Sequence, residues 1–183
     1  MLRVLFLFYL LGFSLVGTAS SLYQIDIIVF TRAYTENDQV ENTPPLLAGY
    51  HTQFAIPLKP HEPGSSGLYQ LMPQSSSSLK DAWNRLNHQA QYRPLLHYTW
   101  IQPSNNQRSV LLAAQTNDHW DVKGTIRVRQ SNYYLLDTQL QFSAPNGKHK
   151  HFVLADKQRL KPGNTYYIDH PQGGMLINVH RVS

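Results

Sequence analysis

The sequence predicts an α+β fold, in which an antiparallel sheet of about six to eight strands has one main helix packed on it and a long Pro-rich loop. Three observations support this prediction. Apolar and polar residues alternate over most of the chain after residue 94, which is the period of β-strands. One segment has the spacing of an amphipathic helix, and proline is concentrated between residues 33 and 67.

The composition limits the chemistry that the chain can perform. The chain has 183 residues, of which 42% are hydrophobic, and this size suits a single domain. It contains no cysteine, which excludes disulfide scaffolds, Cys-ligated metal sites, thiol nucleophiles and acylation of a cysteine. Its 16 Lys and Arg against 11 Asp and Glu give a formal net charge of +5, which favours anionic partners without identifying one.

Residues 1–19 have the order of a secretory signal peptide. One cation precedes an apolar run, and small residues stand at positions −3 and −1 of a cleavage site, namely Gly17 and Ala19. The apolar run is shorter than the roughly 20 residues that cross a bilayer, which favours cleavage over an uncleaved anchor helix. We therefore expect an exported, periplasmic protein whose residues 20–183 form a single domain without a membrane span.

The first predicted strand covers residues 22–30. Apolar residues fill one face of this segment and extend onto the other, so the strand should lie near the middle of a sheet and be partly covered on both sides. Residues 33–67 follow as a long irregular loop, in which only residues 54–58 resemble a strand.

A helix is expected over residues 79–91. Four apolar residues lie at positions i, i+4, i+7 and i+11 of this segment, namely Leu79, Trp83, Leu86 and Ala90. Ser78 and Asp81 have the spacing of a capping box, in which side chains satisfy free N–H groups at a helix start. Pro94 excludes the helical conformation for the residue before it and ends the helix.

The remaining chain is predicted to form strands joined by turns. Ser131-Asn132 is expected to be one turn, and Asn146-Gly147 is typical of a type I′ turn between antiparallel strands. The expected strands lie at about residues 95–101, 109–114, 121–129, 133–142, 150–159, 166–169 and 175–182.

The strand expected at residues 121–129 has basic residues on its outer face. Its alternation turns Val122, Ile126 and Val128 toward the core, and it exposes Lys123, Arg127 and Arg129. These cations can meet carboxylates on a polymer, although a solvated face gives the same pattern.

The aromatic content suggests a further contact with sugars. The chain has 11 Tyr, 3 Trp and 7 Phe, and alternation assigns Tyr98, Trp100 and Tyr134 to the core. Tyr133 and Tyr166 remain as surface groups that can stack on sugar rings or peptide bonds. Single-stranded nucleic acid also suits aromatics beside cations, but export argues against nucleic acid as a partner.

Two pairs of residues invite a metal or catalytic interpretation. His149 and His151 share one side of a strand, a spacing that can hold a divalent metal, but no third ligand is evident and a solvated turn explains the pair better. Asp169 and His170 could serve a hydrolase, but neighbouring strand residues point to opposite faces. We therefore predict no catalytic residue, no metal and no cofactor.

Four segments resemble a known family in their order and spacing from residue 22 onward. They are Tyr23–Phe30, Leu96–Gln102, Gly124–Val128 leading into Asn132–Asp137, and Tyr167–Pro171 followed by Gly174. Together they resemble the CsiV family of periplasmic peptidoglycan-binding proteins. The resemblance implies a Gram-negative envelope protein that binds peptidoglycan and supports cell-wall assembly beside a penicillin-binding wall synthase and its lipoprotein activator, without cutting bonds.

The residues and the resemblance together define a set of candidate ligand-binding positions, and they leave two other functions open. The candidates are Lys123, Arg127, Arg129, Tyr133, Arg159, Tyr166, Asp169 and His170. One alternative is a protein-interaction subunit of a wall-synthase complex without direct glycan binding, supported by the long loop and a possible edge strand. The other is a hydrolase that uses Asp169 and His170.

Overall fold

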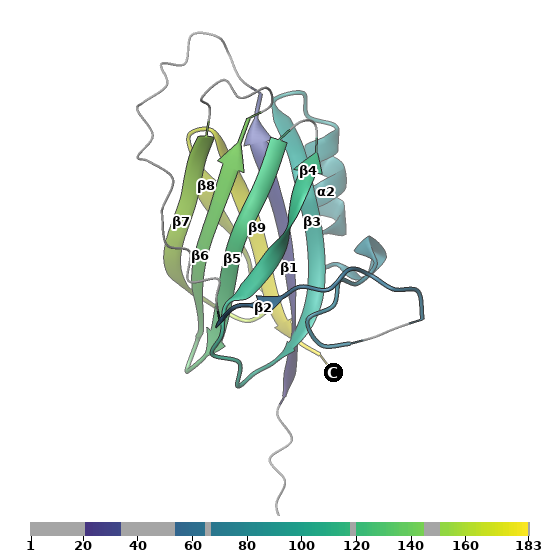
Figure 1. Ribbon diagram of the computed structural model, residues 1–183, viewed down its shortest axis with the longest axis vertical. Helices are drawn as coiled ribbons and strands as arrows, with labels where there is room; N and C mark the ends of the chain where they lie inside the picture. Colours follow the sequence, from purple (N-terminus) through teal and green to yellow (C-terminus); the bar gives the residue numbers. More distant parts are fainter. Residues whose placement is uncertain (1–20, 34–53, 65–66, 118–119, 145–150, 183) are drawn as a thin grey trace, which may run out of the picture.

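The protein is a β-sandwich of two sheets that pack face to face (Figure 1). The computed structural model describes residues 21–33, 54–64, 67–117, 120–144 and 151–182, so the predicted signal peptide and the Asn146-Gly147 turn lie outside the described residues. The α+β prediction of one sheet under a main helix is wrong, because the fold is mostly β, with 61% of the described residues in strands and 9% in helices.

The strands follow the predicted sequence order with shifted ends. They are β1 (Leu22–Arg32), β2 (Ile56–Pro57), β3 (Tyr92–Pro103), β4 (Val110–Asn117), β5 (Trp120–Gln130), β6 (Tyr134–Ser143), β7 (His151–Leu160), β8 (Thr165–His170) and β9 (Gly173–Arg181). Sheet A has the order β3-β1-β9-β8, and sheet B has the order β2-β4-β5-β6-β7. All pairings are antiparallel except the short one between β2 and β4.

The main core lies between the two sheets. Fully buried side chains from sheet A, including Ile25 and Trp100, meet Ile126 and Leu140 of sheet B in one cluster. A strand whose alternate residues are buried requires a cover over that face, but alternation does not say whether a helix or a second sheet provides the cover. This ambiguity is the reason that the single-sheet prediction failed.

A buried hydrogen bond joins the two sheets. The hydroxyl of Tyr23 in β1 donates to the backbone oxygen of Val128 in β5 at 3.1 Å. Gln102 Nε2 donates to the same oxygen at 3.2 Å, so a buried carbonyl at the end of β5 is fully satisfied. Burial raises the pKa of Tyr23 to about 12, and its hydroxyl remains a donor at any physiological pH.

The outer face of β1 is also covered, as the sequence predicted. Helix α2 (Lys80–Asn87) packs on this face, where Leu79 and Trp83 cluster with Ile28 and Phe30 (Figure 1). β1 is therefore buried along almost its whole length. The helix is shorter than the predicted span, because the chain leaves the helical conformation after Asn87 and enters β3 at Tyr92.

The predicted capping box is absent, and Ser78 has a different role. Leu79 occupies the N-cap position and makes no side-chain capping bond. Ser78 donates from Oγ to Asp26 Oδ2 at 2.6 Å, and its backbone N–H donates to the same oxygen at 3.2 Å. Asp26 is fully buried in β1 and also accepts a bond from Gln24 Nε2 at 2.9 Å. The carboxylate thus attaches the start of the helical segment to sheet A.

His97 forms a second polar contact under the helix. It lies on the outer face of β3, where its ring stacks on Trp83 with a centroid separation of 5.2 Å. His97 Nε2 lies 2.8 Å from Ser77 Oγ, next to the short 3-10 helix η2 (Gln74–Ser76). Burial lowers the pKa of His97, and the nearby Asp26 opposes that shift only in part.

The free energy of unfolding should therefore decrease as the pH falls below about 6.5, the ordinary pKa of histidine. Unfolded His97 takes up a proton near that pH, whereas the folded protein resists protonation, so acid favours the unfolded state. Urea unfolding at pH 7.5 and pH 5.5 measures the effect. His97→Phe should weaken the pH dependence, leaving the part due to His170, whose pKa burial also lowers. The exposed His88 provides the control variant His88→Gln, and equal slopes in both variants would contradict the prediction.

The described part of the Pro-rich loop and the segment that follows it each cover one sheet edge. The strand predicted at residues 54–58 is reduced to β2, which pairs with the outer edge of β4. Tyr69 N donates to Ile101 O at 2.9 Å and Met72 N donates to Thr99 O at 2.8 Å, so the edge of β3 is covered as well. The opposite edges of the two sheets, β7 and β8, have no neighbouring strand among the described residues.

Candidate functional site

Most of the candidate residues meet on the outer face of β5, β6 and β7, which we call the basic face. Its side chains alternate with core residues along each strand, and its cations are Lys123, Arg127, Arg129, Lys157 and Arg159. The acids with the same orientation on these strands are Asp121 and Asp137. The basic face therefore has an excess of positive charge on a rigid sheet.

The turn between β5 and β6 sets the pairing across the basic face. Gln130 pairs with Tyr134, so the turn contains three residues, 131–133, and Ser131 N donates to Tyr133 O at 2.8 Å. The predicted two-residue turn at Ser131-Asn132 is one residue too short. The longer turn places Arg127 opposite Asp137 instead of beside a core residue, so the fully buried apolar side chains of both strands share the inner face, whereas the half-buried Leu135 lies on the outer face.

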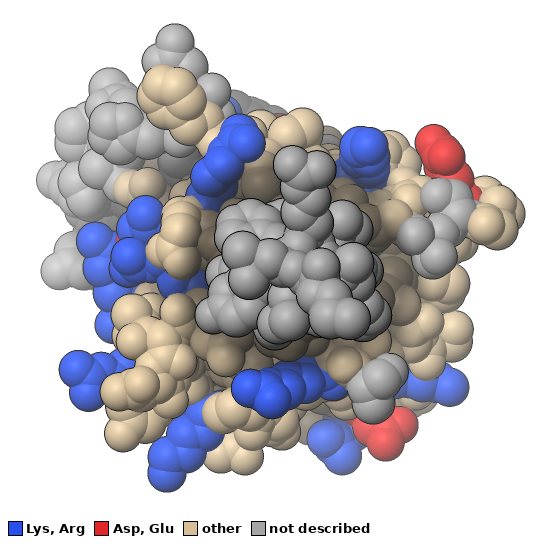
Figure 2. Space-filling view, turned by 90° about the horizontal axis from the view of Figure 1, so that it is seen from below, with Lys and Arg blue, Asp and Glu red and all other residues tan. Residues whose placement is uncertain are grey.

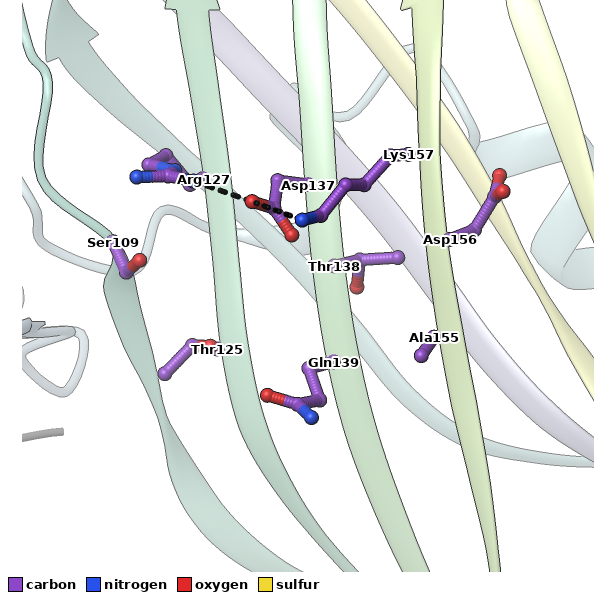
Figure 3. Close-up of a pocket in the computed structure, with 9 residues that line it drawn as sticks. All are labelled: Ser109, Thr125, Arg127, Asp137, Thr138, Gln139, Ala155, Asp156 and Lys157. Atoms are coloured by element: carbon purple, nitrogen blue, oxygen red, sulfur yellow. Dashed lines mark hydrogen bonds and ion pairs between the residues drawn. The ribbon is translucent and has the colours of Figure 1, made fainter. Parts of the chain in front are cut away.

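Arg127, Asp137 and Lys157 lie side by side on the three strands (Figure 3). Arg127 Nη2 donates to Asp137 Oδ2, and Lys157 Nζ lies 3.8 Å from the same oxygen. The Arg127 side chain is 32% exposed and the Lys157 side chain 78%, so Arg127 is held in place while Lys157 is largely solvated. One carboxylate is thus shared by two cations, which leaves net positive charge for a ligand.

A second basic pair lies next to this group, toward the turn. Arg129 and Arg159 flank Leu135, and the Arg159 guanidinium lies 5.6 Å from the centre of the Tyr133 ring in a cation–π contact. Lys and Arg predominate over Asp and Glu on the end of the molecule seen in Figure 2. The Nε atoms of Arg127 and Arg129 are buried and have no hydrogen-bond partner among the described residues.

A hollow of about 570 Å³ opens on the basic face (Figure 3). The charged group lies along one side of it, and the uncharged polar residues Thr125 and Gln139 lie beyond that group. The residues that line it are Ser109, Thr125, Arg127, Asp137, Thr138, Gln139, Ala155, Asp156 and Lys157. Of these residues, only Arg127 belongs to the candidates predicted from the sequence. Lys157 stands two residues before Arg159 and so shares its face of the strand, which means that alternation would have identified it. The positions of Asp137 and Gln139 in the hollow depend instead on the register between strands.

The other three candidates lie on β8 in sheet A, away from the basic face. Tyr166 packs against the main core, and its hydroxyl accepts a hydrogen bond from Lys161 N at 2.8 Å, so the ring is not free for stacking. His170 stacks on Phe152 with a centroid separation of 4.5 Å, whereas the Asp169 carboxylate points outward to Arg32. The expectation that Asp169 and His170 face opposite sides is confirmed.

Asp169 belongs to a hydrogen-bonded cluster that joins β8 to β1. Its Oδ1 accepts bonds from the Tyr167 hydroxyl at 2.5 Å and from Arg32 Nη2 at 2.7 Å. The Tyr167 bond and the Arg32 charge hold the pKa of Asp169 below its ordinary value. Gly174 makes room for this arrangement, because an added Cβ would lie 2.6 Å from the Tyr167 ring. These contacts give the segment around Asp169 a structural role.

The described residues contain neither a cluster of metal ligands nor a membrane-spanning helix. No group of three or more His, Cys, Asp or Glu suited to a metal ion occurs within the described ranges, and His149 of the predicted metal pair lies outside them. Within the same ranges, no helix combines the length and apolar character needed to cross a membrane.

Comparison with known families gives a match over almost the whole chain. The sequence model of a family described as "Peptidoglycan-binding protein, CsiV" matches residues 2–182. The chain belongs to the CsiV family. The resemblance drawn from the sequence is thereby confirmed, and the family description supports peptidoglycan as the ligand and the cell envelope as the location. Comparisons with curated proteins and with solved structures give no match.

The four segments that carry the CsiV resemblance have different positions in the fold. Tyr23–Phe30 and Leu96–Gln102 lie in the central strands β1 and β3 and are mostly buried. Tyr167–Pro171 forms the cluster around Asp169. Only Gly124–Val128 and Asn132–Asp137 cross the basic face, where they contribute Arg127, Tyr133 and Asp137. They are therefore the part of the CsiV pattern that contains exposed charged groups suited to a ligand.

Proposed function

We propose that this member of the CsiV family binds peptidoglycan directly through its basic face. The observation that supports the proposal is the excess of five cations from β5 and β7 over the two acids of the basic face, of which Asp137 contacts Arg127 and Lys157. Peptidoglycan contains many carboxylates, and Arg and Lys bind carboxylates through charge-assisted hydrogen bonds. The half-buried arginines are already restrained by their neighbours in the sheet, so they lose little conformational entropy when a ligand binds, which favours the complex.

In the proposed function, the protein acts in the periplasm and does not catalyse a reaction. Residues 1–19 would direct export and be removed, and residues 20–183 would form the binding domain. The family description as a binding protein and the separation of Asp169 from His170 both favour a role without bond cleavage. In this role the protein would support or regulate wall synthesis beside a penicillin-binding synthase and its lipoprotein activator.

The proposal predicts that removing three cations weakens binding to the cell wall. The triple variant Lys123→Ala, Arg127→Ala, Arg129→Ala should bind washed sacculi about tenfold more weakly, because each lost charged contact contributes up to about 1 kcal/mol. Co-pelleting at several salt concentrations measures the affinity, which should fall as salt rises. Circular dichroism verifies that the variant is folded.

The matched control removes three cations from other surfaces. The variant Lys80→Ala, Arg85→Ala, Arg181→Ala changes the net charge equally but alters helix α2 and the end of β9. It should retain most of the binding. Equal losses in both triple variants would mean that only net charge matters and would contradict a defined site. Release of soluble muropeptides into the supernatant by the wild-type protein would contradict a role without catalysis.

A second candidate function is a protein-interaction subunit without direct wall binding. The edges of β7 and β8, which no strand covers within the described ranges, favour it, because an edge strand can pair with a strand of a partner. In this case the purified protein would not pellet with sacculi at any salt concentration, and a photo-crosslinker placed at Asp156 in β7 would capture one dominant envelope protein in cells.

A further inference from the structure

The hollow on the basic face offers little surface to a sugar ring. No aromatic residue lines it in the described structure. Tyr133, the exposed aromatic residue of this face, lies outside the lining, and its ring is in contact with the Arg159 guanidinium. Sugar rings commonly bind by stacking on exposed aromatic faces. The chemistry of the hollow therefore differs from that of a sugar-binding groove.

The same hollow is well suited to carboxylates and amides. Arg127 and Lys157 border it, and Arg129 and Arg159 follow two residues along the same strands. Each pair of cations is therefore spaced by about 7 Å along its strand, which is also the repeat of same-side substituents in an extended peptide. The neighbouring Thr125 and Gln139 supply uncharged donors and acceptors for peptide amides.

We propose, on the basis of the function proposed above, that the basic face recognises the free carboxylates of the peptide stems of peptidoglycan and not its sugar rings. In the assembled polymer the lactyl carboxyl group of the glycan is consumed in the amide bond to the stem, so the free carboxylates belong to the stem peptides. Asp137 adds selectivity in two ways. Its negative charge lowers the positive charge density of the basic face, which disfavours a polyphosphate, and its carboxylate can accept hydrogen bonds from the ammonium group of a stem diamino acid.

The test compares three preparations derived from the same sacculi. The purified protein is incubated with intact sacculi, with glycan strands from which an amidase has removed the stems and whose released lactyl carboxyl groups have then been converted to methylamides, and with intact sacculi in the presence of the released stem peptides. The protein should bind the stripped glycan at least about tenfold more weakly than intact sacculi. The released stem peptides should compete with intact sacculi for the protein, and this competition should be lost when the carboxylates of the peptides are converted to amides.

A pair of variants assigns this effect to the basic face. Arg129→Ala combined with Arg159→Ala should weaken stem-peptide binding about tenfold, whereas Lys80→Ala combined with Arg85→Ala should not change it. Equal binding to stripped glycan and intact sacculi would overturn the inference and leave the proposed function in place. Failure to bind intact sacculi would instead overturn the proposed function.

Discussion

Replacing Gly124 with valine should destabilise the sandwich by about 4 kcal/mol or more, which is a large part of the roughly 5–15 kcal/mol by which an ordinary domain is stable. Gly124 lies in the middle of β5 with φ +151°, a conformation that side chains rarely adopt. An ideal Cβ at this position would lie 2.1 Å from Gln139 O and 2.9 Å from Leu140 Cα. Both atoms belong to the backbone of β6, so the clash can be relieved only by separating the two strands.

The matched control for this prediction is Gly163→Ala. Gly163 also has a positive φ, of +75°, but no atom lies within 4 Å of its ideal Cβ, so the substitution should cost only about 1 kcal/mol. Urea unfolding followed by tryptophan fluorescence compares the variants. A smaller loss for Gly124→Val than for Gly163→Ala would show that β5 and β6 separate easily at this point.

The position of Gly124 follows from an irregularity in the sheet. The pairing of β4 with β5 shifts between Leu112 and Gln115, so β4 contains one extra residue directly beside the glycine. Glycine inside a strand commonly marks such a bulge or a close approach of backbones. Because β5 provides Lys123 and Arg127 on either side of Gly124, this irregularity also affects the shape of the basic face.

The second large effect is expected for Asp26→Ala, which should lower the free energy of unfolding by about 3 kcal/mol. The substitution removes the acceptor for Ser78 and Gln24 at a fully buried position and leaves a cavity beneath the segment before α2. Hydrogen exchange should increase first in helix α2, because that segment is attached to β1 through this carboxylate.

Asp81→Ala is the matched control for Asp26→Ala. Asp81 is an exposed carboxylate in the first turn of α2, where its favourable interaction with the helix terminus amounts to about 0.3–1 kcal/mol. Urea unfolding of the two variants should therefore separate them by at least about 2 kcal/mol. Equal losses would mean that Asp26 contributes nothing beyond an ordinary surface charge.

Local patterns predicted the elements of this fold better than its architecture. Alternation located most of the strands within a few residues, and it predicted that β1 is covered on both faces, because apolar residues such as Ile28 and Phe30 occupy its second face. The division into two sheets depends on contacts between residues far apart in sequence, such as that of Tyr23 with Val128. Periodicity within one strand contains no information about these contacts.

The candidate site was predictable only in part for the same reason. Lys123, Arg127 and Arg129 share a strand, so their common face follows from their spacing. Arg159 joins them through two registers, that of β5 with β6, which the turn at 131–133 sets, and that of β6 with β7, which this turn does not set. The pairing of Ser78 with Asp26 was missed because the partners are 52 residues apart, whereas the expected capping box was local.

The pairing of β1 with β9 has a consequence for the order in which the protein forms. The strands β4 to β7 follow one another in the sequence, so this part of sheet B closes through short-range contacts, which form fastest. Sheet A is not complete until β9, which follows all its other strands in the sequence, pairs with β1. Until β9 is available, the apolar β1 has an open edge, which exposes the newly made chain to aggregation.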